Sequence, residues 1–191
     1  MPANGCGFIE AKGWVFGNGG GATQANLDQF SVYRVPRDGY EAGNPPNTPA
    51  AQLLYNDESA NRDAHGVGVT TNEKYVWVGD RSGNVVEVFR ARSGRHVGTI
   101  DLVSAYSNDP TADLFATSPD GKFFFMSTRG PVPLTGDPHS STGSDPGLLV
   151  LRITTVGRGG EVVGLARISN IGADGVERAD AHGIRLRRIL E

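Results

Sequence analysis

Residues 65–80, with the sequence HGVGVTTNEKYVWVGD, decide the fold because their pattern returns 48 positions later. The second copy, residues 113–128, reads DLFATSPDGKFFFMST, and Arg81 and Arg129 follow the two copies at the same offset. Each copy consists of a short apolar stretch, a polar turn and an aromatic-rich stretch, which is the pattern of a β-hairpin. The chain is therefore predicted to contain two equivalent antiparallel strand pairs.

Two more strands are expected after each hairpin. Residues 85–89 and 148–153 have the pattern of a third strand, and residues 96–102 and 161–168 that of a fourth. Four short strands in a repeat of about 40–50 residues are typical of β-propeller blades.

The pattern extends in both directions along the chain. Upstream, residues 13–18 (GWVFGN) resemble residues 75–80, and strands are expected at 30–35 and near 51–55. Downstream, residues 180–183 repeat residues 63–66 letter for letter as Asp-Ala-His-Gly, and a new strand is expected at 184–188.

These units predict an all-β fold, a β-propeller of four-stranded antiparallel blades in an incomplete ring of about three to three and a half blades. One incomplete blade, two full blades and the opening strand of another are expected. The predicted boundaries are 5–60 for blade 1, 63–105 for blade 2, 111–170 for blade 3 and 180–191 for the start of blade 4.

The stretch that begins at Tyr75 resembles the YVTN-type repeat of surface-layer-like and lactonase-like seven-bladed β-propellers. Residues 75–89 give an aromatic strand, a polar turn, a small-residue loop and a hydrophobic strand, and residues 92–100 add a Ser-Gly turn and a strand ending in Thr-Ile. Trp77 and Val78 stand where the family has threonine and asparagine. The resemblance is best over residues 63–128, and it implies a seven-bladed ring of which this chain supplies about half.

Composition excludes several classes of protein. With 38% hydrophobic and 20% charged residues, the 191-residue chain is too apolar to be disordered, and its 27 glycines and 11 prolines suit many tight turns. A net charge of −3 argues against a general polyanion binder, so no nucleic-acid partner is expected. No apolar run reaches the roughly 18–20 residues of a membrane span. The single cysteine, Cys6, excludes an internal disulfide and a multi-cysteine zinc site.

The first residues, MPANG, show neither a charged region nor an apolar region of a signal peptide. The sequence leaves two compartments open. The protein is cytoplasmic, or it is periplasmic or extracellular if its N-terminus is truncated.

One face of the predicted propeller collects the polar residues. Pairing Val69 with Tyr75 puts His65 opposite Gly79, so His65 and Asp80 lie at the same open end of the hairpin. First strands line the channel of a propeller, so His65 and its equivalents Asp113 and His182 are expected around the channel mouth. The long connections at 17–29 and 130–146 open on the same face, and long loops on a rigid scaffold often carry function.

The candidate ligand-binding residues on this face are His65, Asp80, Arg81, Asp113, Arg129, His139 and His182. His65, Asp113 and His182 also form a weak candidate metal set, chemically suited to zinc or iron, although neighbouring blades diverge around the axis. A divalent metal is the one cofactor left open. For the repeated Asp-Ala-His-Gly itself, a structural interpretation is favoured over a ligand, metal or catalytic role: the aspartate bonds to backbone, the histidine packs between blades and the glycine fits a crowded inner strand.

Two function classes remain open, and no catalytic residue is assigned. The favoured one is a binding module that holds a protein partner or small ligand at the loop-bearing face, since no nucleophile is identifiable. The other is a lactonase-like hydrolase or metal-dependent enzyme with its site at the channel mouth. An incomplete ring also predicts self-association through uncovered blade faces, which would carry Phe123 and Phe125.

Overall fold

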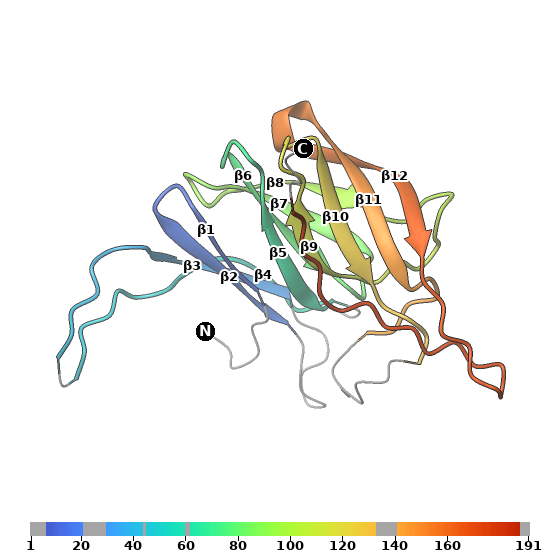
Figure 1. Ribbon diagram of the computed structural model, residues 1–191. Coiled ribbons are helices and arrows are strands. Elements are labelled where there is room, and N and C mark those ends of the chain that lie inside the picture. Colours follow the sequence, from blue (N-terminus) through green and yellow to red (C-terminus); the bar gives the residue numbers. More distant parts are fainter. Residues whose placement is uncertain (1–6, 21–29, 44, 60–61, 133–140, 188–191) are drawn as a thin grey trace.

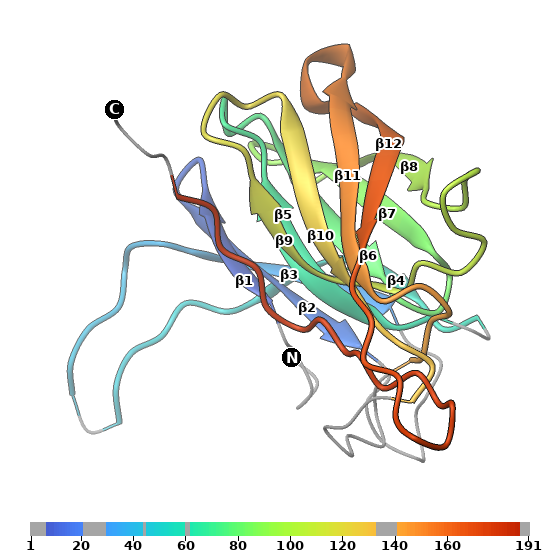
Figure 2. The ribbon, with the colours of Figure 1, turned by 45° about the vertical axis from the view of Figure 1, so that its right-hand side comes forward.

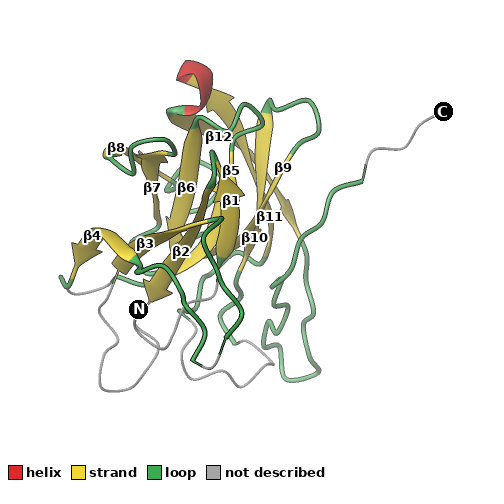
Figure 3. Ribbon diagram, turned by 90° about the vertical axis from the view of Figure 1, so that its left-hand side faces the viewer, coloured by secondary structure: helices red, strands yellow, loops and turns green. Residues whose placement is uncertain are grey.

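The computed structural model describes residues 7–20, 30–43, 45–59, 62–132 and 141–187, and in these ranges the protein is all-β (Figure 1). The described residues contain twelve strands in three four-stranded sheets, and one helical turn, η1 (Thr155–Gly157), shown in red in Figure 3. The first sheet consists of β1 (Phe8–Ala11), β2 (Trp14–Gly20), β3 (Phe30–Pro36) and β4 (Gln52–Asp57). The second consists of β5 (Ala64–Val69), β6 (Tyr75–Asp80), β7 (Val85–Arg90) and β8 (His96–Asp101). The third consists of β9 (Ala112–Thr117), β10 (Phe123–Thr128), β11 (Gly147–Thr154) and β12 (Gly159–Arg167).

The three sheets are blades of a β-propeller. Within each sheet the strands follow chain order, and each strand pairs antiparallel with the next. The sheets stand side by side in an open arc (Figure 2), and β5 contacts β1 and β2 on one side and β9 on the other. The described strands do not close into a ring. Within the described residues, no helix is long and apolar enough to span a membrane.

The 48-residue repeat is visible in the strands themselves. β5 and β9 start at Ala64 and Ala112, and β6 and β10 start at Tyr75 and Phe123, so both pairs are related by the predicted offset. Equivalent strands therefore place His65 and Asp113 at the same position of neighbouring blades, as predicted.

The arc differs from the prediction at its two ends. Blade 1 has four strands rather than an incomplete set, because β1 pairs with β2 through a tight turn at Lys12 and Gly13, which both have positive φ. A lysine in the left-handed region gives no Asn-Gly type of hairpin signal, so this turn was not predicted. At the other end, residues 184–187 form no strand, since none of the described residues offers them a ladder partner.

The predicted hairpin register is wrong by one residue near the turn. Val69 pairs with Val76 rather than Tyr75, and a bulge between Ala64 and Val67 then brings Ala64 opposite Asp80. The bulge inserts an extra residue into β5 and restores the expected alignment at the open end. His65 and Asp80 therefore do lie at the same end of the hairpin.

Apolar side chains between the blades form the core. Every residue of β6 is buried, and alternate residues face opposite neighbours. Val76 and Val78 pack with Phe16 and Phe30 of blade 1, whereas Trp77 packs with blade 3, where its ring stacks on that of Phe124 at 4.4 Å between centroids. Full burial of such a side chain contributes about 2–3 kcal/mol, so contacts between blades stabilise the arc.

The outer faces of the arc are only partly covered. Phe123 and Phe125 are half-buried on the side of β10 that faces away from blade 2, and they line a hollow together with Leu186. On blade 1, Phe8 and Leu53 are 62% and 56% exposed and lie in one row across the sheet. Both faces expose apolar area, as an incomplete ring predicts.

Candidate functional site

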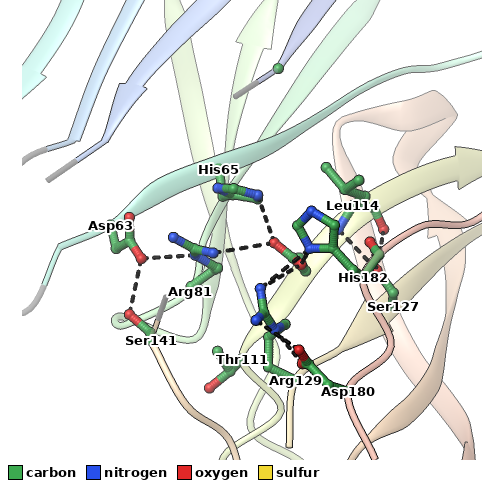
Figure 4. Close-up of polar contacts among 12 residues, drawn as sticks. Asp63, His65, Arg81, Thr111, Leu114, Ser127, Arg129, Ser141, Asp180 and His182 are labelled. Atoms are coloured by element: carbon green, nitrogen blue, oxygen red, sulfur yellow. Dashed lines mark hydrogen bonds and ion pairs between the residues drawn. The ribbon is translucent and has the colours of Figure 1, made fainter. Parts of the chain in front are cut away.

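Seven polar side chains meet at one end of blades 2 and 3 (Figure 4), and we call them the Asp113 cluster. They lie around the first strands of blades 2 and 3, at the ends of β6 and β10, and in the segment that follows β12. The members are Asp63, His65, Arg81, Asp113, Arg129, Asp180 and His182.

Asp113 is the centre of the cluster, and its side chain is fully buried. Its Oδ1 accepts from Nε2 of His65 at 2.8 Å and lies 3.4 Å from Nη1 of Arg81. Its Oδ2 lies 3.2 Å from Nη1 of Arg129 and contacts Nδ1 of His182. Burial opposes ionisation, but the hydrogen bond of His65 and the charges around it hold the pKa of Asp113 below its ordinary value. Asp113 is therefore a buried carboxylate with four donors.

The two arginines join the inner strands of neighbouring blades. Arg81 donates from Nε to Oδ2 of Asp63 at 2.8 Å, in addition to its contact with Asp113. Arg129 forms a two-pronged pair with Asp180, with Nε to Oδ1 at 2.5 Å and Nη2 to Oδ2 at 2.9 Å. Thr111 occupies the position equivalent to Asp63, so blade 3 lacks its own carboxylate there and Arg129 pairs with the next copy of the motif.

The two histidines bind the same carboxylate but differ in exposure. The side chain of His65 is 6% exposed and that of His182 is 50% exposed, and their ring centroids are 5.9 Å apart. Since Asp113 is ionised, each ring donates its N–H to it, from Nε2 in His65 and from Nδ1 in His182. Nη1 of Arg129 lies 3.3 Å from the same Nδ1 and, in this tautomer, contacts it without a hydrogen bond. This tautomer leaves Nε2 as the acceptor of His182, on a half-exposed side chain.

The end of the cluster is bordered by the long connection between β10 and β11. Of residues 130–146 the structure describes 130–132 and 141–146. Ser141 donates from Oγ to Oδ2 of Asp63 at 3.0 Å, and its Oγ lies 2.5 Å from that of Ser82. On the other side, Ser127 donates to the main-chain oxygen of His182 at 2.8 Å, which fixes that segment against β10. The expected convergence of a long loop with the inner strands is therefore seen.

The arrangement also bears on the predicted metal set. Ligand atoms of His65, Asp113 and His182 lie within 4.8 Å of one another, so the expected divergence of the blades does not separate them. Nitrogen and oxygen ligands of this kind suit zinc or iron. However, Asp113 already accepts from Arg81, Arg129 and both histidines. A metal would have to displace those hydrogen bonds, so the donor set suits a cation but its present contacts compete with one.

Two predicted residues are not part of the cluster. Asp80 is buried, but its carboxylate lies 2.6 Å from Nε of Arg62 and accepts from the main-chain nitrogens of Asp63 and Gly83 at 2.9 and 2.8 Å. Burial raises the pKa of Asp80. These contacts give Asp80 a role in closing the turn after β6. His139 lies outside the described residues.

His65, Arg81, Asp113, Arg129 and His182 were predicted as candidates, and the structure brings them together. Asp63 and Asp180 were not among the predicted site residues. The signal that could have found them is the repeat itself, because both are the first residue of Asp-Ala-His-Gly.

Solved structures share this fold. Two crystal structures, each of a “putative 6-phosphogluconolactonase”, align with 90% of the chain: one from Bacteroides fragilis at a TM-score of 0.53 and 15% identity, and one from Bacteroides uniformis at 0.56 and 17%. The chain spans 45% of the length of each. No protein-family model and no curated protein matches the chain. At these identities the likeness shows a common propeller fold.

Proposed function

We propose that the Asp113 cluster is the catalytic centre of a lactonase-like hydrolase, with His182 as general base. The observation that carries the proposal is a half-exposed histidine bonded to a fully buried carboxylate whose pKa is lowered. An aspartate that holds a histidine in one tautomer is a recurring arrangement in hydrolases. The fold shared with the two structures described as 6-phosphogluconolactonases supports a lactone as the substrate class.

The proposed step is attack of water on the carbonyl carbon of a lactone. Nε2 of His182 takes a proton from the water as the new C–O bond forms, and the ring C–O bond then breaks. The proton passes to the alkoxide that leaves, so the product is a hydroxy acid and His182 is neutral again. With neutral histidines the cluster has three carboxylates and two guanidiniums, and this residual negative charge stabilises the transient imidazolium.

The other cluster residues act through Asp113 and are positioning residues. Arg81 and Arg129 are 2% and 1% exposed, so they do not face a substrate. They keep Asp113 ionised and fix its two oxygens toward the histidines. His65 occupies Oδ1 and leaves Oδ2 for His182.

A test compares His182→Gln with His96→Gln in the full chain. His96 is a matched control because its Nε2 binds the buried Glu87 at 2.7 Å with a side chain 32% exposed, outside the cluster. With glucono-δ-lactone and δ-valerolactone as probes, we expect His182→Gln to lower kcat/KM about 100-fold or more and His96→Gln to leave it unchanged. Equal rates in the two variants, or no turnover by the unmodified chain, would contradict the hydrolase proposal.

The second candidate is the binding module. It is favoured by the observation that most cluster side chains are buried in mutual pairs, which is how a rigid platform for loops such as that of Ser141 would be built. In that case the same lactones would raise the melting temperature of the unmodified protein, His182→Gln would abolish the shift, and the lactones would be recovered intact.

We infer further that the chain is part of a YVTN-type ring. Three blades that span 45% of each similar structure, and the exposed apolar residues Phe8 and Leu53 on blade 1, support an arc that is completed by other blades. Sedimentation equilibrium of the 191-residue chain should then show self-association. A stable monomer that unfolds cooperatively would overturn this inference and leave the proposal for His182 standing.

A further inference from the structure

A second polar surface lies at the opposite end of the blades. β6 ends at the Asp113 cluster and begins at Tyr75, which borders a hollow of about 690 Å³ at the hairpin turns. A second hollow, of about 450 Å³, lies beside the first, and Arg90 lines both. Their basic lining residues, which we call the turn surface, are Lys12, Lys74, Arg90, Arg92, Arg95 and Arg158.

The charges of the turn surface are largely uncompensated. Glu73 is the acidic residue that lines these hollows, and it pairs with Lys12 at 3.5 Å. Within the described residues, no carboxylate lies at ion-pair distance from the other five basic side chains. By contrast, Arg37 pairs with Glu10 and Asp38. A chain with a net charge of −3 thus concentrates positive charge at one place, and guanidinium groups match the geometry of phosphate and carboxylate.

An apolar and strained turn stands beside these charges. Thr155 and Val156 have φ of 49° and 57°, a conformation that is costly for β-branched residues. Val156 is 70% exposed, and it lines the larger hollow together with the largely buried Tyr75, whose ring faces the guanidinium of Arg90 at 5.7 Å.

Blade 2 holds this turn in place. Asn72 donates to the main-chain oxygen of Val156 at 3.2 Å, and Trp77 donates from Nε1 to that of Gly157 at 2.8 Å. The exposed valine is therefore fixed in position from the neighbouring blade, on the rim of a basic hollow.

We propose that the turn surface is a second ligand site, which binds a small molecule with a phosphate or carboxylate group on an apolar body. The anionic group lies among Arg90, Arg92 and Lys74, and the apolar body contacts Val156 and Tyr75. The site does not depend on the proposed hydrolase activity. The turn surface carries a positive charge, whereas carboxylates outnumber arginines in the Asp113 cluster. An anion is therefore attracted to the turn surface rather than to the cluster.

The test is a titration of the full chain with phenyl phosphate, benzoate and neutral phenol, followed by ¹H–¹⁵N NMR. We expect saturable shifts of the amides of residues 73–75, 90–95 and 155–158 with phenyl phosphate or benzoate, whichever group the site prefers. Phenol should bind at least 10-fold more weakly than the preferred anion. Arg90→Gln should weaken the anion about 10-fold, and Val156→Gly about 5-fold.

Two controls separate this site from other effects. Arg37→Gln removes a paired arginine outside both hollows, and His182→Gln removes the proposed base; both should bind the anion as the unmodified chain does. Equal binding by Arg90→Gln and Arg37→Gln would overturn the proposal. So would shifts around Asp113, or binding of an oligoglutamate peptide without binding of either small anion, which would indicate an acidic protein partner instead.

Discussion

Two copies of Asp-Ala-His-Gly occur in the chain, and the structure gives them different surroundings. In the first copy His65 lies in β5, between blade 1 and β9, and its side chain is 6% exposed. In the second copy His182 lies outside the described strands and its side chain is 50% exposed. The glycines differ in the same way. A Cβ on Gly66 would lie 2.1 Å from the main-chain oxygen of Asp113, whereas one on Gly183 would meet nothing within 4 Å.

Two copies of a motif with identical residues can therefore have different roles in the structure. Both histidines bind Asp113, so their chemistry is shared. Packing decides the rest. His65 is enclosed by strands on both sides at the junction between blades, while His182 lies outside the described strands with a half-exposed side chain.

The largest effect is expected from Asp113→Ala, because it removes the carboxylate on which both copies depend. Arg81 and Arg129 would each lose a buried partner, and removal of one side of a buried ion pair costs about 3–5 kcal/mol. Urea denaturation should show this loss, and Asp120→Ala, which removes only turn hydrogen bonds to Ser118 and Lys122 at the surface, should cost less than about 1 kcal/mol. If Asp113→Ala is as stable as Asp120→Ala, the cluster does not join the blades.

The next largest effect is expected from alanine substitution of the two glycines, which should lower stability in the first copy of the motif but not in the second. Gly66→Ala places a methyl group against the main chain of β9 and should cost about 1–3 kcal/mol, since backbone cannot move aside cheaply. Gly183→Ala should change the free energy of unfolding by less than about 0.5 kcal/mol. Similar melting temperatures for the two variants would show that the copies are equally packed.

The two histidines give the same contrast with a smaller expected effect. His65→Ala leaves Oδ1 of a buried carboxylate short of a donor and should cost about 1–2 kcal/mol. His182→Ala should leave stability nearly unchanged and remove hydrolysis or lactone binding. Thermal melts and the lactone assay on both variants check this prediction. If His182→Ala is the destabilised variant and His65→Ala the one that loses activity or binding, the roles assigned to the two histidines are reversed.

Acid should weaken the cluster in a defined range of pH. The folded-state pKa of Asp113 is lowered, so its contribution is fully present above the unfolded value of about 3.9 and is lost as the pH falls through the folded value. The stability difference between the unmodified protein and Asp113→Asn should therefore be constant from pH 7 to about pH 5 and shrink below pH 4. A difference that grows toward low pH would mean that Asp113 is protonated in the folded protein.

Much of the fold could be predicted from the sequence, because strand order follows from local pattern. The 48-residue repeat located β5, β6, β9 and β10. The turn at Lys12 could not be predicted, since a positive φ at lysine leaves no sequence signal, and neither could the bulge that shifts the register of β5.

The site was predictable only in part. The repeat predicted that His65, Asp113 and His182 lie at the same end of the blades. It did not predict that their ligand atoms lie within 4.8 Å of one another, because neighbouring blades were expected to diverge. The ion-pair partners of the charged side chains did not follow from the strand pattern. Asp80 pairs with Arg62 rather than with a member of the cluster, and Arg129 pairs with Asp180 because Thr111 offers it no carboxylate. Both outcomes depend on contacts between segments far apart in the chain.

The most direct test of the shared carboxylate is the tautomeric state of the two histidines. Two-dimensional ¹H–¹⁵N NMR of the imidazole rings near pH 8 distinguishes Nδ1–H from Nε2–H. We predict opposite tautomers, Nε2–H for His65 and Nδ1–H for His182, and loss of both preferences in Asp113→Asn. If both rings carry the proton on the same nitrogen, or if His182 is unaffected by Asp113→Asn, then Asp113 does not orient His182 and the proposed general base is wrong.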